Sequence, residues 1–174
     1  MRARLLFSLV LVLVLLQAIE LRGAEPTKKE RKPTTITSDH LEVNRKLHWA
    51  VYSGDVVLQD RENDITILSD RLEFFFDEKM EEVKKAVAVG SVRVNSGTRR
   101  STSERAEYLP AEQQVVLTGN PKVWQEDDLV SGSKITIFFN EDRAIAEGDG
   151  KTRVQAVIHP KKGGKDLKRE QESR

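Results

Sequence analysis

Residues 67–94 read ILSDRLEFFFDEKMEEVKKAVAVGSVRV, and this stretch decides the fold class. Apolar and polar residues alternate at Leu72, Phe74 and Phe76 near its start, and again at Val92 and Val94 near its end. Period-two alternation of β-branched and aromatic residues predicts half-buried strands. The charged segment between them has too few apolar residues to bury a helical face, so it predicts a turn. The stretch therefore predicts an all-β protein.

The same pattern recurs along the chain. One unit runs from ITSDHLEV (36–43) to YSGDVVL (52–58), and another from STSERAEY (101–108) to LTGNPKV (117–123). A fourth begins at LVSGSKITIFF (129–139) and weakens through the following residues. A regular spacing predicts units that bury their apolar faces only by stacking on neighbours. The units are marked by glycines at spacings of 36, 29 and 29 residues, namely Gly54, Gly90, Gly119 and Gly148.

The apolar alternation shifts by one residue across two of these glycines. Trp49 and Val51 precede Gly54, whereas Val56 and Leu58 follow it, and the second unit shows the same shift. A one-residue shift turns a strand over unless the backbone bulges or bends there, and glycine makes such a bend easier. The shift therefore predicts a corner in the sheet at each marker glycine. A simple hairpin turn at each glycine is equally consistent with the sequence.

The two ends of the chain differ from the repeats. Basic residues precede the apolar run Leu5–Leu16, whose twelve residues reach roughly 18 Å as a helix, short of a ~30 Å hydrocarbon core. This predicts a cleavable signal peptide over residues 1–24, with an anchor retained up to Leu21 as the alternative. A charged linker (25–34), the β-domain (35–159) and a charged tail predicted to be disordered (160–174) complete the chain.

Composition argues against several other classes of protein. The formal net charge is +1, which disfavours a nucleic-acid binder, and the absence of cysteine removes disulfides and thiolate chemistry. His40, His48 and His159 are scattered without metal-ligand spacing. Ser38 and Asp39 precede His40 directly on one predicted strand, so their side chains alternate between faces and form no catalytic relay. We therefore expect no enzyme activity, no metal and no cofactor.

The repeats resemble a known family. Taken together the units, and VVLTGNPKV (115–123) above all, resemble the OstA/LptA family of lipopolysaccharide transport proteins, over roughly residues 36–157. Gly54 and Gly90 are followed by Asp and Ser, where the family usually has Asn. The resemblance implies an open, twisted β-jellyroll with a V-shaped section, whose hydrophobic interior holds the acyl chains of lipopolysaccharide.

The alternating strands supply candidates for this interior. Each methylene exposed to water costs about 0.8 kcal/mol, so one acyl chain of about a dozen carbons costs on the order of 10 kcal/mol, which an apolar trough offsets. A plain core face is the other interpretation of the same residues. The predicted lipid-binding residues are Ile36, Ile65, Ile67, Leu72, Phe74, Val92, Val94, Tyr108, Leu117, Ile135 and Ile137.

The resemblance also implies partners and a location. It implies a periplasmic protein that stacks end to end with like copies, and with LptC-like and LptD-like jellyroll domains, to bridge the inner and outer membranes. Ile36–Val43 and Thr152–Ile158 are the predicted terminal strands, with edges free to pair. Three alternatives stay open: an LptC-like component anchored in the inner membrane, a structural β-repeat without a ligand, and a carbohydrate-binding module using Trp49 and Trp124.

Overall fold

The computed structural model describes residues 33–160, which form twelve β-strands and no helix. The prediction of an all-β fold is confirmed. In this part of the chain no helix could cross a membrane. The strands are β1 (Thr34–Thr37), β2 (His40–Asn44), β3 (Trp49–Asp60), β4 (Ile65–Phe76), β5 (Val83–Ser96), β6 (Arg99–Leu109), β7 (Gln114–Thr118), β8 (Lys122–Gln125), β9 (Asp128–Ser131), β10 (Lys134–Phe138), β11 (Arg143–Glu147) and β12 (Gln155–Val157).

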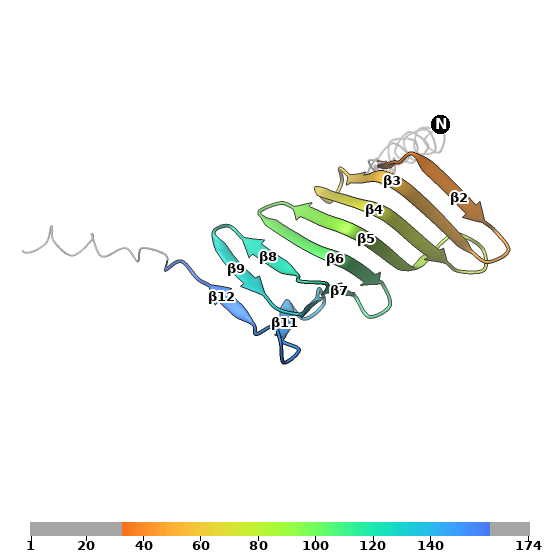
Figure 1. The fold of residues 1–174 in the computed structure, drawn as a ribbon. Coiled ribbons are helices and arrows are strands. Elements are labelled where there is room, and N and C mark those ends of the chain that lie inside the picture. The colour runs from red at the N-terminus through yellow and green to blue at the C-terminus, as the bar shows by residue number, and fades with distance from the viewer. Residues whose placement is uncertain (1–32, 161–174) are drawn as a thin grey trace, which may run out of the picture. The chain divides into compact units, whose positions relative to one another are not determined.

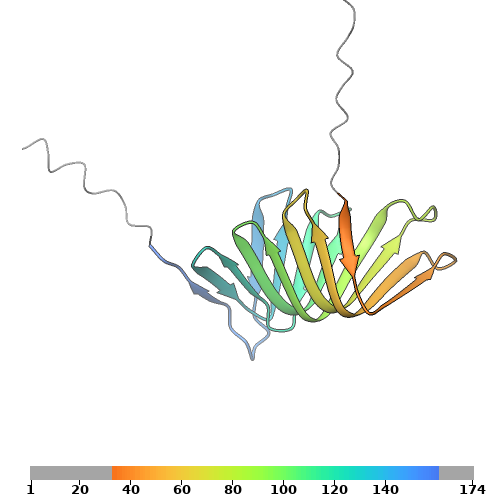
Figure 2. The same ribbon diagram turned by 90° about the horizontal axis from the view of Figure 1, so that it is seen from above.

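All twelve strands belong to one antiparallel sheet, and the four long strands β3 to β6 lie side by side at its centre (Figure 1). Each long strand bends near its middle, so the sheet has two arms (Figure 2). The first arm has the strand order β1-β3-β4-β5-β6-β8-β9-β12. The second arm has the order β2-β3-β4-β5-β6-β7-β10-β11. The sheet is thus open at both ends, as expected.

The bends occur at the marker glycines. The pairing register shifts between Ser53 and Val56 of β3, where Gly54 has a φ of 80°. Gly90 lies at the corresponding shift in β5, also with a φ of 80°. Gly119 (φ 77°) lies between β7 and β8, where the chain passes from the second arm to the first. Three marker glycines are therefore corners, as one interpretation of the sequence held, and the hairpin interpretation is wrong for them.

An acidic residue packs against each of these three corner glycines. The N–H of Asp39 donates to the carbonyl of Gly54 over 3.0 Å, and a Cβ atom at Gly54 would lie 2.7 Å from the Asp39 Cβ. A Cβ at Gly90 would lie 2.7 Å from Cγ of Asp70. The corner thus leaves no room for a side chain. In the first three units, the acidic residue near the start of the unit and the marker glycine near its end thus form one corner together.

The two arms pack against each other across the bend. Val56 of the first arm belongs to one buried cluster with Leu72 and Ala88 of the second arm. We call the face on which these residues meet the inner face, and the opposite side of the sheet the outer face. Tyr52 packs against the same cluster and is therefore also on the inner face.

The alternation shift that predicted the corners has a different cause from the one inferred. Tyr52 and Val56 lie on the inner face on both sides of Gly54, so β3 does not turn over there. Val51, which precedes the glycine, lies on the outer face and pairs with Glu73 of β4. Trp49 and Val51, the two residues whose alternation indicated the shift, are thus on the outer face. Val51 is 8% exposed although it lies on this face, and Glu42 and Glu73 flank it on the neighbouring strands.

The charged segment after β4 forms a turn, as predicted. β4 ends at Phe76 and β5 begins at Val83. The carboxylate of Asp77 accepts hydrogen bonds from the backbone N–H groups of Glu81 over 2.8 Å and Glu82 over 3.1 Å. These bonds, the one from Glu82 most of all, hold the pKa of Asp77 below its usual value. The turn is therefore closed by its own first residue, which satisfies the backbone locally.

The signal peptide predicted over residues 1–24 and all but the last residues of the linker (25–34) lie outside the described residues, and so does nearly all of the tail (160–174). These three assignments stay predictions. The described sheet begins with β1 and ends with β12.

Candidate functional site

The inner face of the second arm is apolar from one end of the sheet to the other. Residues paired across neighbouring strands form two rows that each cross all eight strands of the arm. Every residue in both rows is apolar or aromatic, so no polar side chain interrupts either path. The first row is Leu41, Tyr52, Leu72, Ala88, Ala106, Leu117, Ile135 and Ala146, and the second is Val43, Ala50, Phe74, Ala86, Tyr108, Val115, Ile137 and Ala144.

The inner face of the first arm is apolar near the bend and polar toward its rim. One row crosses all eight strands of this arm and contains a single polar residue, Ser101. The next row toward the rim contains mainly polar residues, among them Asp60, Arg99 and Gln125. The apolar row consists of Ile36, Leu58, Ile67, Val94, Ser101, Val123, Val130 and Ala156.

All eleven residues predicted from the sequence lie on the inner face. The first arm contributes Ile36, Ile65, Ile67, Val92 and Val94. The second arm contributes Leu72, Phe74, Tyr108, Leu117, Ile135 and Ile137. The structure therefore gathers them into one lining. Whether they bind lipid is not tested by their position and stays a prediction.

Sequence reasoning missed several members of the lining. Tyr52, Val56 and Leu58 were not assigned, although Leu58 pairs directly with Ile67. Val123 and Val130 were also missed, because the short strands β8 and β9 give little alternation to count. The signal that could have found them is the pairing register, since a residue shares the face of its cross-strand partner.

Burial falls from the bend toward the rim. Val56 and Leu117 are each 1% exposed near the bend. Tyr108 and Phe139 are 41% and 57% exposed near the rim of the second arm, and their rings contact each other with centroids 6.4 Å apart. Large apolar side chains that stay exposed on one concave face mark a binding surface more often than a folding core. The deep residues hold the arms together, and the shallow ones remain available for a ligand.

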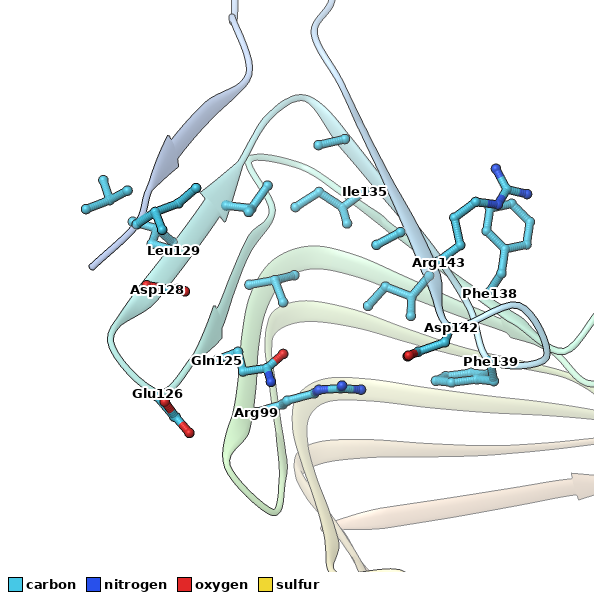
Figure 3. Close-up of a pocket in the computed structure, with 17 residues that line it drawn as sticks. Arg99, Gln125, Glu126, Asp128, Leu129, Ile135, Phe138, Phe139, Asp142 and Arg143 are labelled. Atoms are coloured by element: carbon cyan, nitrogen blue, oxygen red, sulfur yellow. The ribbon is translucent and has the colours of Figure 1, made fainter. Parts of the chain in front are cut away.

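The lining opens into a pocket of about 730 Å³ near the C-terminal end of the sheet. Ile135 and Ile137 line its second-arm side, and Val123 and Val130 line its first-arm side. Charged residues lie around the mouth, where Figure 3 shows the Arg99 side chain extending into the pocket. A hollow lined by both apolar and charged residues suits an amphiphile whose chains contact the apolar part of the lining.

The ends of the sheet expose unpaired strand edges. Two strands, β1 and β2, form one end and overlap the predicted single terminal strand Ile36–Val43, and β12 lies within the predicted range Thr152–Ile158. The second arm ends instead with β11 (Arg143–Glu147), which the sequence reasoning did not single out. Leu41 and Val43 on β2 are 49% and 50% exposed. Each end of the described sheet thus has two unpaired strand edges, and the apolar rows of the inner face continue up to these edges.

Comparison with known proteins places the chain in a family. Residues 35–143 match the sequence profile of the family described as LptA/(LptD N-terminal domain) LPS transport protein. This match covers more than half of the 174 residues. The chain belongs to this LptA/LptD N-terminal family. Comparison with curated protein sequences gave no significant match.

A solved structure supports the LptA-like fold. The crystal structure of LptH, the LptA-homologous periplasmic component of the lipopolysaccharide transport device of Pseudomonas aeruginosa, superposes with a TM-score of 0.65 at 21% identity. The match covers 74% of this chain and 96% of that chain. At this identity the likeness establishes the open jellyroll fold. The LptA family is a family of transport proteins and not of enzymes.

Ser38, His159 and Asp128 of this LptA-family domain make contacts that serve the fold. Within residues 33–160 no group of three or more His, Asp or Glu side chains could hold a metal ion. The Ser38 hydroxyl donates to the carbonyl of His40 over 3.0 Å rather than to its ring. His159 lies 3.7 Å from Asp128, whose carboxylate accepts the His159 backbone N–H over 2.8 Å, so this pair ties the chain beyond β12 to β9.

Proposed function

We propose that this chain carries lipopolysaccharide through the periplasm, with the acyl chains on the inner face and the sugars outside. The observation that carries the proposal is the pair of unbroken apolar rows that cross the second arm from edge to edge. A closed core would need only the residues near the bend. Rows that continue to both ends provide an apolar path along the whole sheet.

Membership in the LptA family of LPS transport proteins supports this choice of ligand. Each acyl chain in water costs on the order of 10 kcal/mol, and lipopolysaccharide carries several, so an exposed intermediate is not accessible. The apolar second arm and the polar rim of the first arm provide the two environments that an amphiphile needs. Together they favour a carrier over a purely structural repeat.

We further propose that copies of the domain stack end to end, and that LptC-like and LptD-like domains continue the stack. Each arm has eight antiparallel strands, so its first and last strands run in opposite directions. A second copy docked head to tail would therefore pair antiparallel in both arms at once. Main-chain hydrogen bonds from two edges at each junction would join the apolar linings of the copies.

Site-specific photocrosslinking in the envelope tests the ligand. We expect a photoreactive residue at Ile67 or Tyr108 to crosslink to lipopolysaccharide, because both face the interior. Leu68 and Glu107, the adjacent residues on the outer face, are the matched controls. An absence of crosslinks from the inner positions, or equal crosslinking from both faces, would contradict the proposal and leave the structural repeat as the better explanation.

The location of the chain is tested at its N-terminus. We propose that the predicted signal peptide is removed and that the domain is free in the periplasm. Sequencing the N-terminus of the protein isolated from the envelope should then find that residues 1 to about 24 have been lost. An intact Met1 would instead favour the inner-membrane-anchored, LptC-like alternative.

A further inference from the structure

The outer faces of the two arms differ in charge. On the second arm, cations and carboxylates pair with one another. Arg71 lies 2.6 Å from Glu73, and Glu107 accepts both Lys85 over 2.8 Å and Arg105 over 3.1 Å. The Lys85 hydrogen bond, and then that of Arg105, lower the pKa of Glu107. This face is therefore balanced by its own ion pairs.

The outer face of the first arm carries cations that form no ion pairs with carboxylates of the described residues. Arg93, Thr102 and Lys122 are paired across β5, β6 and β8, and Arg100 lies in the adjacent row beside Trp124. The other residues in these two rows are neutral. Within residues 33–160 none of the three cations has an ion-pair partner, and all three are exposed. The face thus has a positive charge that the fold does not use.

A hollow lies among these cations. Its volume is about 290 Å³, and its lining includes Arg93, Thr102, Lys122 and the corner residues Gly119 and Asn120. Neighbouring strands lie about 4.8 Å apart, so the two cations flank the Thr102 hydroxyl at a separation of roughly 10 Å between strands. One carboxylate, from Glu104, lies at the corner side of the hollow. Two cations and a hydroxyl around a shallow hollow suit a phosphate group.

Further cations lie between this hollow and the mouth of the inner pocket. The turn between β5 and β6 forms part of the rim of the first arm, and Arg99 and Arg100 follow it directly. Arg99 lines the inner pocket, while Arg100 lies on the outer face with its guanidinium 5.0 Å from the centre of the Trp124 ring. Cations therefore continue from the mouth, over the rim, to Arg93 and Lys122.

We infer that the outer face of the first arm binds the phosphate groups on the sugar part of lipopolysaccharide. The inference rests on the proposed function, because acyl chains held on the inner face leave the phosphorylated sugars at the rim. Arg93 and Lys122 bind phosphate across the hollow, and Arg100 binds beside the rim. The site holds the head group on one side of the domain while the chains stay in the groove.

Isothermal titration calorimetry at low ionic strength tests this site by measuring the Kd of a phosphorylated probe. The probe is the water-soluble phosphorylated oligosaccharide left after the acyl chains of lipopolysaccharide are removed, so binding does not require the groove. We expect the purified protein to bind it and the Arg93→Gln/Lys122→Gln variant to bind about tenfold more weakly, because two charge-assisted contacts are lost. The matched control, Arg71→Gln/Lys134→Gln, removes the same charge from the second arm and should change the Kd less than about twofold.

Four outcomes would overturn the inference. If lipopolysaccharide crosslinks to the interior but the oligosaccharide does not bind, the inference fails and the proposed function stands. If the control variant weakens binding as much as the test variant, general charge and not this site is responsible. If vesicles of anionic phospholipid bind through Arg93 and Lys122 whereas the oligosaccharide does not, the face contacts membranes. Equal binding of the dephosphorylated oligosaccharide would also contradict a phosphate site.

Discussion

Replacing Gly90 by alanine should destabilise the domain through the corner between its arms. Gly90 has a φ of 80°, and a Cβ at this position would lie 2.7 Å from Cγ and 2.9 Å from Cβ of Asp70. Two costs are therefore combined in one substitution. The first is the left-handed backbone conformation, and the second is the steric conflict with the neighbouring strand.

The two costs can be separated with Gly97. This residue also has a positive φ, 56°, but a Cβ there would meet nothing within 4 Å. Gly97→Ala should therefore cost only the backbone term, about 1–2 kcal/mol. Gly90→Ala should cost the same plus about 1–3 kcal/mol for displacing Asp70 from a close-packed corner. The sum is a large share of the roughly 5–15 kcal/mol by which a domain is stable.

Urea unfolding followed by circular dichroism measures both variants. We expect the midpoint of Gly90→Ala to fall clearly below that of Gly97→Ala, with similar m-values. Adding Asp70→Gly to Gly90→Ala should recover part of the loss, because the conflicting side chain is removed. If the two alanine variants are equally stable, the corner does not depend on contact between glycine and the acidic residue, and the packing argument is wrong.

Two further predictions follow from the corner and from the outer face. Ser91 has a φ of 47° and Asn120 has a φ of 55°, and Asn tolerates this left-handed conformation better than Ser. Ser91→Asn should therefore raise the unfolding free energy by roughly 0.5–1 kcal/mol, and Asn120→Ser should lower it by a similar amount. If the urea midpoints of the two variants move in the same direction, this reasoning is wrong. Because the pKa of Glu107 is lowered in the folded state, its pairing stabilises the fold above the unfolded pKa, about 4.3, and is lost as the pH falls through the folded pKa. Glu107→Gln should therefore lower the urea midpoint at pH 7 but not at about pH 2, where both proteins are uncharged at this position; an equal loss at both pH values would refute the linkage.

The repeats and strands could be predicted because their signals are local. Alternation around Leu72 and Phe74 reports a half-buried strand without knowledge of its neighbours. Gly54 and Gly90 were found as corners because the apolar alternation shifts across them, and the structure shows that a close neighbour excludes a side chain at both positions. The eleven lining residues share the inner face because every second residue of a strand lies on the same side of the sheet, which is a local property.

The parts that could not be predicted depend on pairs of strands. Val87 is 1% exposed although it lies on the outer face, because Glu73 and Glu107 flank it on β4 and β6. No pattern within β5 distinguishes it from an inner residue. The β11 edge was missed because Ile145, its one large apolar residue, lies on the outer face opposite Thr136. The burial of Val87 and the position of the β11 edge both depend on which residues pair between strands, and the sequence of a single strand does not specify that pairing.

The even number of strands in each arm fixes how this fold can change in length. Four repeats supply eight strands per arm, so one repeat contributes two strands to each arm. Gain or loss of one repeat would change the groove by about 10 Å, twice the strand spacing, and leave the direction of both end strands unaltered. A single strand would reverse one edge and make the junction parallel. The groove can therefore lengthen only in whole repeats, and every such length keeps the same polarity for its neighbours.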